Sequence, residues 1–159
     1  MTNIEMLENT LPIAPLKLIA MESCKPLGQK VNDYIVSFRE NTINEVTESP
    51  LYRNYKANNY QVDCSCPRFG SGEAKGILKE TIRGTDLFIM TDVCNYSLTY
   101  TVNGHLNHMS PDDHYQDLKR IIAAATGKAR RINVIMPFLY ESRQHKRTSC
   151  LLYTSPSPR

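Results

Sequence analysis

The sequence predicts an α/β fold in which parallel strands form a sheet and helices cover both faces. Three short apolar runs, at 16–21, 87–93 and 132–140, have the length and composition of buried strands. Two helix-like segments lie between them, and their apolar residues recur every three or four positions. Alternation of strands and helices is typical of parallel sheets, because a crossover must return the chain before the next strand begins.

The first helix is predicted over 27–38, followed by a long polar segment. Residues 39–59 are polar and rich in Asn, and we expect them to form an exposed connection or insertion. The apolar face of the helix is expected to comprise Leu27, Val31, Tyr34, Ile35 and Phe38.

Strand patterns in the middle of the chain are weaker. Residues 60–64 alternate loosely between apolar and polar side chains. Residues 74–82 lead through a turn containing Gly84 into the strand at 87–93. Residues 94–109 have the composition of a loop, and we expect a loop there.

The second helix has the clearest start. Ser110 is expected to cap it, Pro111 suits its first position, and Asp113 completes a capping box. Gly127 is placed to end it, and the cations at 128, 130 and 131 suit the negative end of its dipole. The buried stripe is expected to comprise Tyr115, Leu118, Ile121, Ile122 and Ala125.

Composition argues against several classes of protein. The chain has 159 residues, 41% of them apolar, and a net charge of +3, which is small for a nucleic-acid-binding module. No run approaches the ~18 apolar residues of a membrane span, and the start lacks a signal-peptide core. We therefore expect a cytoplasmic protein with reduced cysteines. No metal site is expected, because Cys64 and Cys66 lack a second ligand pair and the helix start explains the aspartates near His108 and His114.

Positive charge gathers after the last predicted strand. The stretch 141–147 reads ESRQHKR, and in parallel sheets ligands bind beyond the carboxyl ends of strands. A guanidinium there can stack on a flat ring or pair with phosphate oxygens. The same residues are also compatible with a solvated loop.

Four stretches resemble, in order, motifs of the ribose-phosphate pyrophosphokinases (PRPP synthetases). RFGSGE at 68–73 resembles the family's Arg-Phe-Ser-Asp-Gly-Glu motif, and ESRQHKR resembles the segment ending in its Arg-Gln-Asp motif. ETIRGTDLFIMTDV at 80–93 resembles its Glu-Ser-Val-Arg-Gly-Lys-Asp-Val strand region, and 111–132 falls at its Asn-Asp-Asn-Leu-Met-Glu-Leu-Leu helix. The resemblance runs from about residue 16 to residue 147.

The resemblance implies a fold and an activity. The fold would be the three-layer sandwich of the type I phosphoribosyltransferases, with this chain as a truncated N-terminal domain. The activity would be a ribose-phosphate diphosphokinase, which uses Mg²⁺ and transfers the diphosphoryl group of ATP to ribose 5-phosphate for nucleotide biosynthesis. The family works as a homo-oligomer that shares its nucleotide site between subunits, and no nucleic-acid or membrane partner is expected.

The resemblance also assigns an ATP site. Phe69 and Arg143 would lie on opposite faces of the adenine, Gln144 matches the motif's glutamine, and Glu73 matches the acidic end of its motif.

Two positions of this ATP site depart from the family. Ser71 and His145 stand where the family has aspartates, so negative charge is lost at both. These departures leave open an alternative, a non-catalytic regulatory paralogue that binds PRPP synthetase.

The resemblance divides the chain into three parts. Residues 1–15 are expected to be an extension, and 16–149 the N-terminal domain with its polar insertion around 39–59. Residues 150–159, CLLYTSPSPR, are interpreted as a non-native read-through tail. The family's catalytic groups would lie beyond 149, so the fragment is expected to hold none and to be inactive alone.

Overall fold

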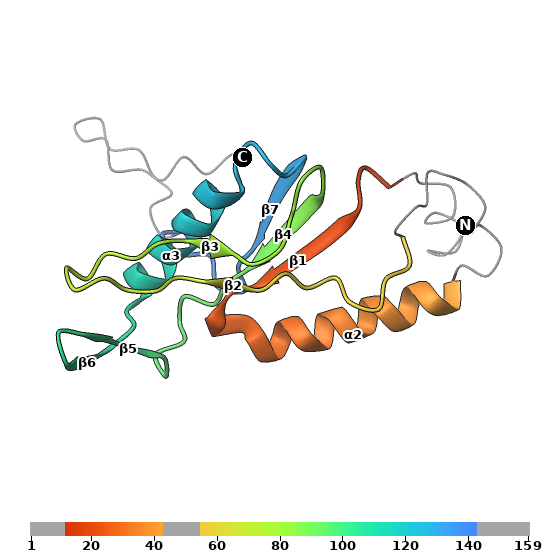
Figure 1. Ribbon diagram of the computed structural model, residues 1–159. Coiled ribbons are helices and arrows are strands. Elements are labelled where there is room, and N and C mark those ends of the chain that lie inside the picture. The colour runs from red at the N-terminus through yellow and green to blue at the C-terminus, as the bar shows by residue number, and fades with distance from the viewer. Residues whose placement is uncertain (1–11, 43–54, 143–159) are drawn as a thin grey trace, which may run out of the picture.

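The structure is a computed structural model that describes residues 12–42 and 55–142 (Figure 1). None of its helices is long and apolar enough to cross a membrane, within the residues described. Its elements are β1 (Leu16–Ala20), the 3-10 helix η1 (Glu22–Cys24), α2 (Lys25–Thr42), β2 (Cys64–Ser65), β3 (Ile77–Leu78), β4 (Asp86–Met90), β5 (Thr99–Val102), β6 (His105–His108), α3 (Pro111–Ala125) and β7 (Arg131–Ile135).

The central sheet is parallel, as predicted, in the order β1-β4-β7. In its register Leu18 lies beside Phe88, and Ile89 lies beside Val134. The last strand is shorter than expected and ends at Ile135, two residues before Pro137, which has no N–H group to donate to a neighbouring strand. The cationic stretch that starts at Glu141 therefore does not follow the strand directly.

Alternate side chains of the sheet enter two separate cores, which confirms the prediction of helices on both faces. Figure 1 shows α2 and α3 on opposite sides of the sheet. On one side, Leu18 and Met90 pack with Cys24, next to α2. The larger core, against α3, comprises Ile19, Met21, Val62, Ile82, Leu87, Ile89, Leu118, Ile121 and Ala125.

The face predicted for helix α2 is only partly right, since Val31 packs against the core beside this helix and Ile35 and Phe38 are half-buried. Leu27 and Tyr34 were expected to be buried, but 42% and 71% of their surfaces are exposed. The buried side also carries Gly28 and Asn32, because α2 lies very close to β1. A Cβ at Gly28 would overlap the Cβ of Ala20.

The polar segment after this helix begins later than expected. Helix α2 continues to Thr42, so residues 39–42 are helical. Residues 43–54 lie outside the described part of the chain, and the insertion stays a prediction. The strand expected at 60–64 is reduced to a parallel bridge of Gln61 beside β1, where the amide of Val62 donates to Leu18 O at 2.8 Å, and Cys64 begins β2.

The expected loop at 94–109 is wrong, because it contains the antiparallel hairpin β5–β6. Asn103 and Gly104 form its turn with φ of 50° and 80°. Positive φ at two consecutive residues is typical of the tight turns that join paired strands. The strand expected at 74–82 is reduced to β3, which pairs with β2. In Figure 1 both hairpins extend to the left of the sheet.

Candidate functional site

The motif at 68–73 forms the tip of the β2–β3 hairpin. Phe69 N donates to Glu73 O at 2.7 Å, and Gly72 N donates to Phe69 O at 2.9 Å. Gly72 has a φ of 88°, where a side chain would be strained. The turn leaves the Phe69 ring 54% exposed. An aromatic ring presented this way is suited to contact a ligand or another chain.

The other two described residues of the predicted ATP site lie on this same turn. Ser71 and Glu73 are both part of its solvent-facing side, and the Ser71 hydroxyl donates to Glu73 Oε2 at 3.3 Å. The structure therefore brings Phe69, Ser71 and Glu73 together. The assignments of Arg143, Gln144 and His145 fall outside the described residues and stay predictions.

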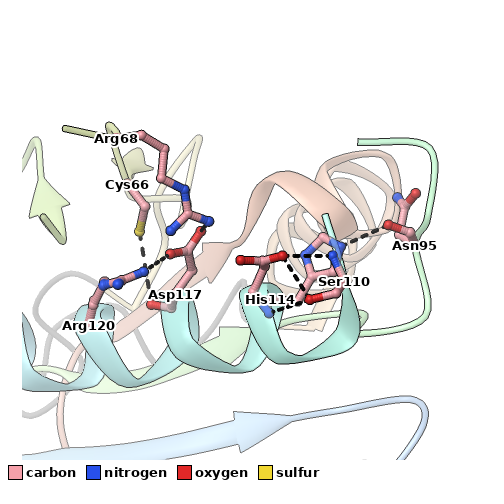
Figure 2. A network of polar contacts seen from close by, with 8 residues as sticks. Cys66, Arg68, Asn95, Ser110, His114, Asp117 and Arg120 are labelled. Atoms are coloured by element: carbon pink, nitrogen blue, oxygen red, sulfur yellow. Dashed lines mark hydrogen bonds and ion pairs between the residues drawn. The ribbon is translucent and has the colours of Figure 1, made fainter. Parts of the chain in front are cut away.

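A buried ion network lies at the root of the turn, on helix α3 (Figure 2). Arg68 Nη2 donates to Asp117 Oδ2 at 3.0 Å, and Arg120 Nη1 donates to Asp117 Oδ1 at 2.7 Å. The side chains of Arg68 and Asp117 are only 7% and 8% exposed. Asp117 thus joins the hairpin to α3 through both carboxylate oxygens.

The β5–β6 hairpin supports this root from another side. The Arg68 guanidinium lies over the Tyr100 ring, 4.6 Å from its centroid. Near the tips, a Cβ at Gly70 would stand 3.4 Å from Asn103 Oδ1. The segment that was expected to be a loop therefore packs against the motif.

Two guanidinium groups surround one carboxylate here, so the network carries an excess positive charge. Burial raises the pKa of Asp117, and the hydrogen bond from Arg120 and the charge of Arg68 oppose that shift. The net stabilisation from such a buried pair is small, but removing one partner leaves a costly buried charge. The network is therefore better suited to fix geometry than to add stability.

A cavity of about 310 Å³ lies beside the network, between the carboxyl end of β1, both hairpins and α3. Phe69, Ser71 and Glu73 do not line it. Its walls include Met21, Ser23, Cys64, Cys66, Arg68, Tyr100, Met109, His114 and Asp117.

The thiols of Cys64 and Cys66 in this cavity have raised pKa values. Desolvation raises the pKa of Cys64 to about 11 and that of Cys66 to about 12. A thiol must lose its proton to act as a nucleophile, so the raised pKa of both groups disfavours such reactions at neutral pH. Among the described residues, no three His, Cys, Asp or Glu side chains are grouped to hold a metal ion.

The start of α3 confirms the predicted capping box. Asp113 N donates to Ser110 Oγ at 3.2 Å, and Ser110 N donates to Asp113 Oδ2 at 2.9 Å. Although desolvation opposes it, these contacts with Ser110 lower the pKa of Asp113. The buried His114 has Nε2 2.8 Å from Asn95 O, so this nitrogen carries a proton (Figure 2). Asp113 and His114 thus both have hydrogen-bond partners within the fold.

Sequence reasoning missed Asp117 and Tyr100 as parts of the site. Arg68 was in the quoted motif, but it received no role. The separation of 49 residues between Arg68 and Asp117 leaves no local pattern in the sequence that pairs them. The one available signal was the position of Asp117 beside Leu118 in the buried stripe, where a charge needs a partner.

Comparisons of the sequence with known proteins all point to the same family. A family model described as the N-terminal domain of ribose phosphate pyrophosphokinase matches residues 16–151. A ribose-phosphate pyrophosphokinase of Staphylococcus epidermidis is 26% identical over 142 residues, covering 89% of this chain and 33% of that protein. One from Bacillus caldolyticus is 33% identical over 84 residues, covering 53% and 22%.

A solved structure shares the fold. The phosphoribosylpyrophosphate synthetase of Mycobacterium smegmatis aligns with a TM-score of 0.50 and 20% identity, covering 83% of this chain and 33% of that one. This chain spans at most about a third of the length of these relatives.

Proposed function

The chain belongs to the family of the N-terminal domain of ribose phosphate pyrophosphokinase, and we propose that it supplies an adenine-binding part of an enzyme with this activity. The reaction transfers the diphosphoryl group of ATP to ribose 5-phosphate and releases AMP. Such transfer depends on positioned charges and on the metal that accompanies the nucleotide. The described residues would contribute to holding the nucleotide.

The exposed ring of Phe69 carries the proposal. Stacking of a purine base on an aromatic side chain contributes ~1–3 kcal/mol to binding. The Phe69 ring is more than half exposed at a tight, hydrogen-bonded turn, where a base can reach it. Arg143 is proposed to contact the opposite face of the adenine, and Gln144 and His145 to lie beside it.

The metal is proposed to arrive with the substrate. Mg²⁺ is commonly held by phosphate oxygens with few protein ligands. The described residues show no group of three candidate ligands, which suits a metal bound mainly by the triphosphate. Mg²⁺ would therefore enter as MgATP.

A shared site between subunits is also proposed. The Phe69 turn projects away from the sheet of its own chain (Figure 1). A ring in this position is suited to enter the nucleotide site of a second copy. We therefore propose a homo-oligomer, in which Phe69 of one subunit completes the site of another.

Replacing Phe69 by Ala tests the nucleotide role. Loss of the stacking face is expected to weaken ATP binding by about 1–2 kcal/mol, and Arg143→Ala is expected to do the same. Isothermal titration of each variant with MgATP measures the change. Leu106→Ala is the matched control, since it removes a similarly exposed apolar side chain from the other hairpin. Unchanged affinity in both Phe69→Ala and Arg143→Ala would contradict the assignment.

A regulatory paralogue is the second candidate. Ser71 stands where the family usually has an aspartate, so this turn lacks that carboxylate, and the Ser71 hydroxyl donates to Glu73 instead. A regulator would bind an active PRPP synthetase and change its rate of AMP release. Assaying that enzyme with and without this chain separates the two functions.

A further inference from the structure

Both arms of the Phe69 turn are fixed to one short part of helix α3, and we propose that Asp117 is a positioning residue that determines where the Phe69 ring stands. The inference rests on the nucleotide role proposed for Phe69. Asp117 would act through the turn, and it would not touch the nucleotide.

The first arm is held by Asp117 through two different groups. Its carboxylate accepts the hydrogen bond from Arg68, and its main-chain oxygen lies 3.9 Å from Cys66 Sγ as acceptor of a weak thiol hydrogen bond. Two of the three residues before Phe69 therefore contact this one residue. Because the pair is almost completely buried, it is not weakened by solvent as a surface pair would be.

The second arm is held by close backbone packing. A Cβ at Gly76 would stand 2.6 Å from Arg120 O and 2.8 Å from Arg120 C, so no side chain fits between this arm and α3. The guanidinium of the same Arg120 donates to Asp117. The two arms are thus linked within a single turn of the helix.

The β5–β6 hairpin limits the remaining freedom. Arg68 is held between the Asp117 carboxylate and the Tyr100 ring. Breaking the ion pair would free Arg68 from α3 while the tip itself stayed solvent-exposed. The expected consequence is a more mobile Phe69 within an otherwise intact fold.

A tryptophan reporter measures this mobility directly. The chain contains no Trp, so Phe69→Trp introduces a single emitter at the tip. Adding Asp117→Asn keeps the size of the side chain and removes its charge. We expect lower steady-state anisotropy and roughly twofold stronger acrylamide quenching, because fewer contacts restrain the turn.

A matched control comes from the other end of the sheet. Asp86 accepts a hydrogen bond from Arg131 Nε at 2.8 Å, so Asp86→Asn also breaks a charge pair but lies away from the turn. It is expected to leave the anisotropy and quenching of the tryptophan reporter unchanged. Equal changes in both variants, or no change with Asp117→Asn, would overturn the proposal.

A second substitution covers the case in which Asp117→Asn does not fold. Gly76→Ala disturbs the other arm without removing a charge, and it is expected to change the anisotropy and quenching of the tryptophan reporter in the same direction. Unaltered signals in a folded Gly76→Ala variant would overturn the proposal.

Binding of MgATP tests the link to function. Asp117→Asn is expected to raise the Kd about three- to tenfold when Phe69 is present and to have no effect beside Phe69→Ala. A loss of the same size in both backgrounds would overturn the positioning role. A further outcome separates the two proposals. If neither Phe69→Ala nor Asp117→Asn changes the Kd for MgATP, the proposed function fails. The positioning of the turn by Asp117 still stands if the tryptophan reporter responds to Asp117→Asn and not to Asp86→Asn.

Discussion

The central sheet and the two hairpins are held by different forces. Ile19 and Ile89 of the sheet are fully buried, whereas Phe69 and Leu106 on the hairpins are more than half exposed. The sheet is therefore stabilised by burial of apolar surface. The tips of the hairpins are held by turns, backbone pairing and a few polar contacts, and only the base of β2–β3 packs against the core, through Cys64, Cys66 and Leu78. Stability and the geometry of the candidate site should consequently respond to different substitutions.

The largest expected difference is between core and tip truncations. Ile89→Ala is expected to reduce the free energy of unfolding by about 3 kcal/mol, because it leaves a cavity between the sheet and α3. Leu106→Ala is expected to change it by less than about 0.5 kcal/mol. Urea denaturation of both variants measures this contrast. Similar losses would mean that the hairpins also belong to the core.

A smaller, local effect is expected at the β5–β6 turn. Gly104→Ala places a Cβ at a φ of 80°, which costs roughly 1 kcal/mol. Amide exchange over 99–108 should speed up while protection of β4 is kept. Asn103→Gly is the control, because glycine tolerates the φ of 50° at that position. Loss of protection in β4 would show that the hairpin and the sheet unfold together.

The smallest expected effect concerns pH. The folded-state pKa of Asp113 is lowered, so its contribution to stability is present above the ordinary value of about 3.9 and is lost as the pH falls through the folded value. Asp113→Asn should therefore reduce the rise in stability with pH in this acidic range. Asp63→Asn, at an exposed carboxylate, is the control. Equal slopes for wild type and Asp113→Asn, from denaturation at several pH values, would contradict the assignment.

The parts of the fold that could be predicted are those with strong local signals. Continuous apolar runs indicated β1 and β4, and the sequence from Ser110 to Asp113 indicated the start of α3. Apolar spacing indicated only part of the packed face of α2. It could not indicate Gly28, which is buried because it is small, or Asn32, which accepts a hydrogen bond from Tyr60 N. Local sequence patterns therefore predicted where helices and strands lie better than which residues they pack against.

The sequence of the β5–β6 hairpin contains a turn signal, although the composition of 94–109 is that of a loop. Its strands are short and partly exposed on both faces, so clear apolar alternation is missing. Asn103-Gly104 nevertheless matches the preferred sequence of a two-residue hairpin turn. Greater weight on this dipeptide would have predicted the hairpin.

The candidate site was predictable only in part. The motif resemblance led to Phe69 and its two neighbours on the turn, which the structure places together. The supports of that turn could not be derived, because Asp117 could have paired with any of 19 lysines and arginines in the sequence. Long-range pairing of this kind depends on the folded arrangement of the chain.

The close approach of Gly28 to Ala20 constrains how the family could diverge. Because a Cβ at position 28 would overlap the Ala20 side chain, a larger residue there requires α2 to move away from β1. Such a movement would shift η1, whose Ser23 lines the cavity beside the Phe69 hairpin. Substitutions at these two small residues should therefore be acquired together, and a relative with a bulkier pair should have a differently shaped cavity.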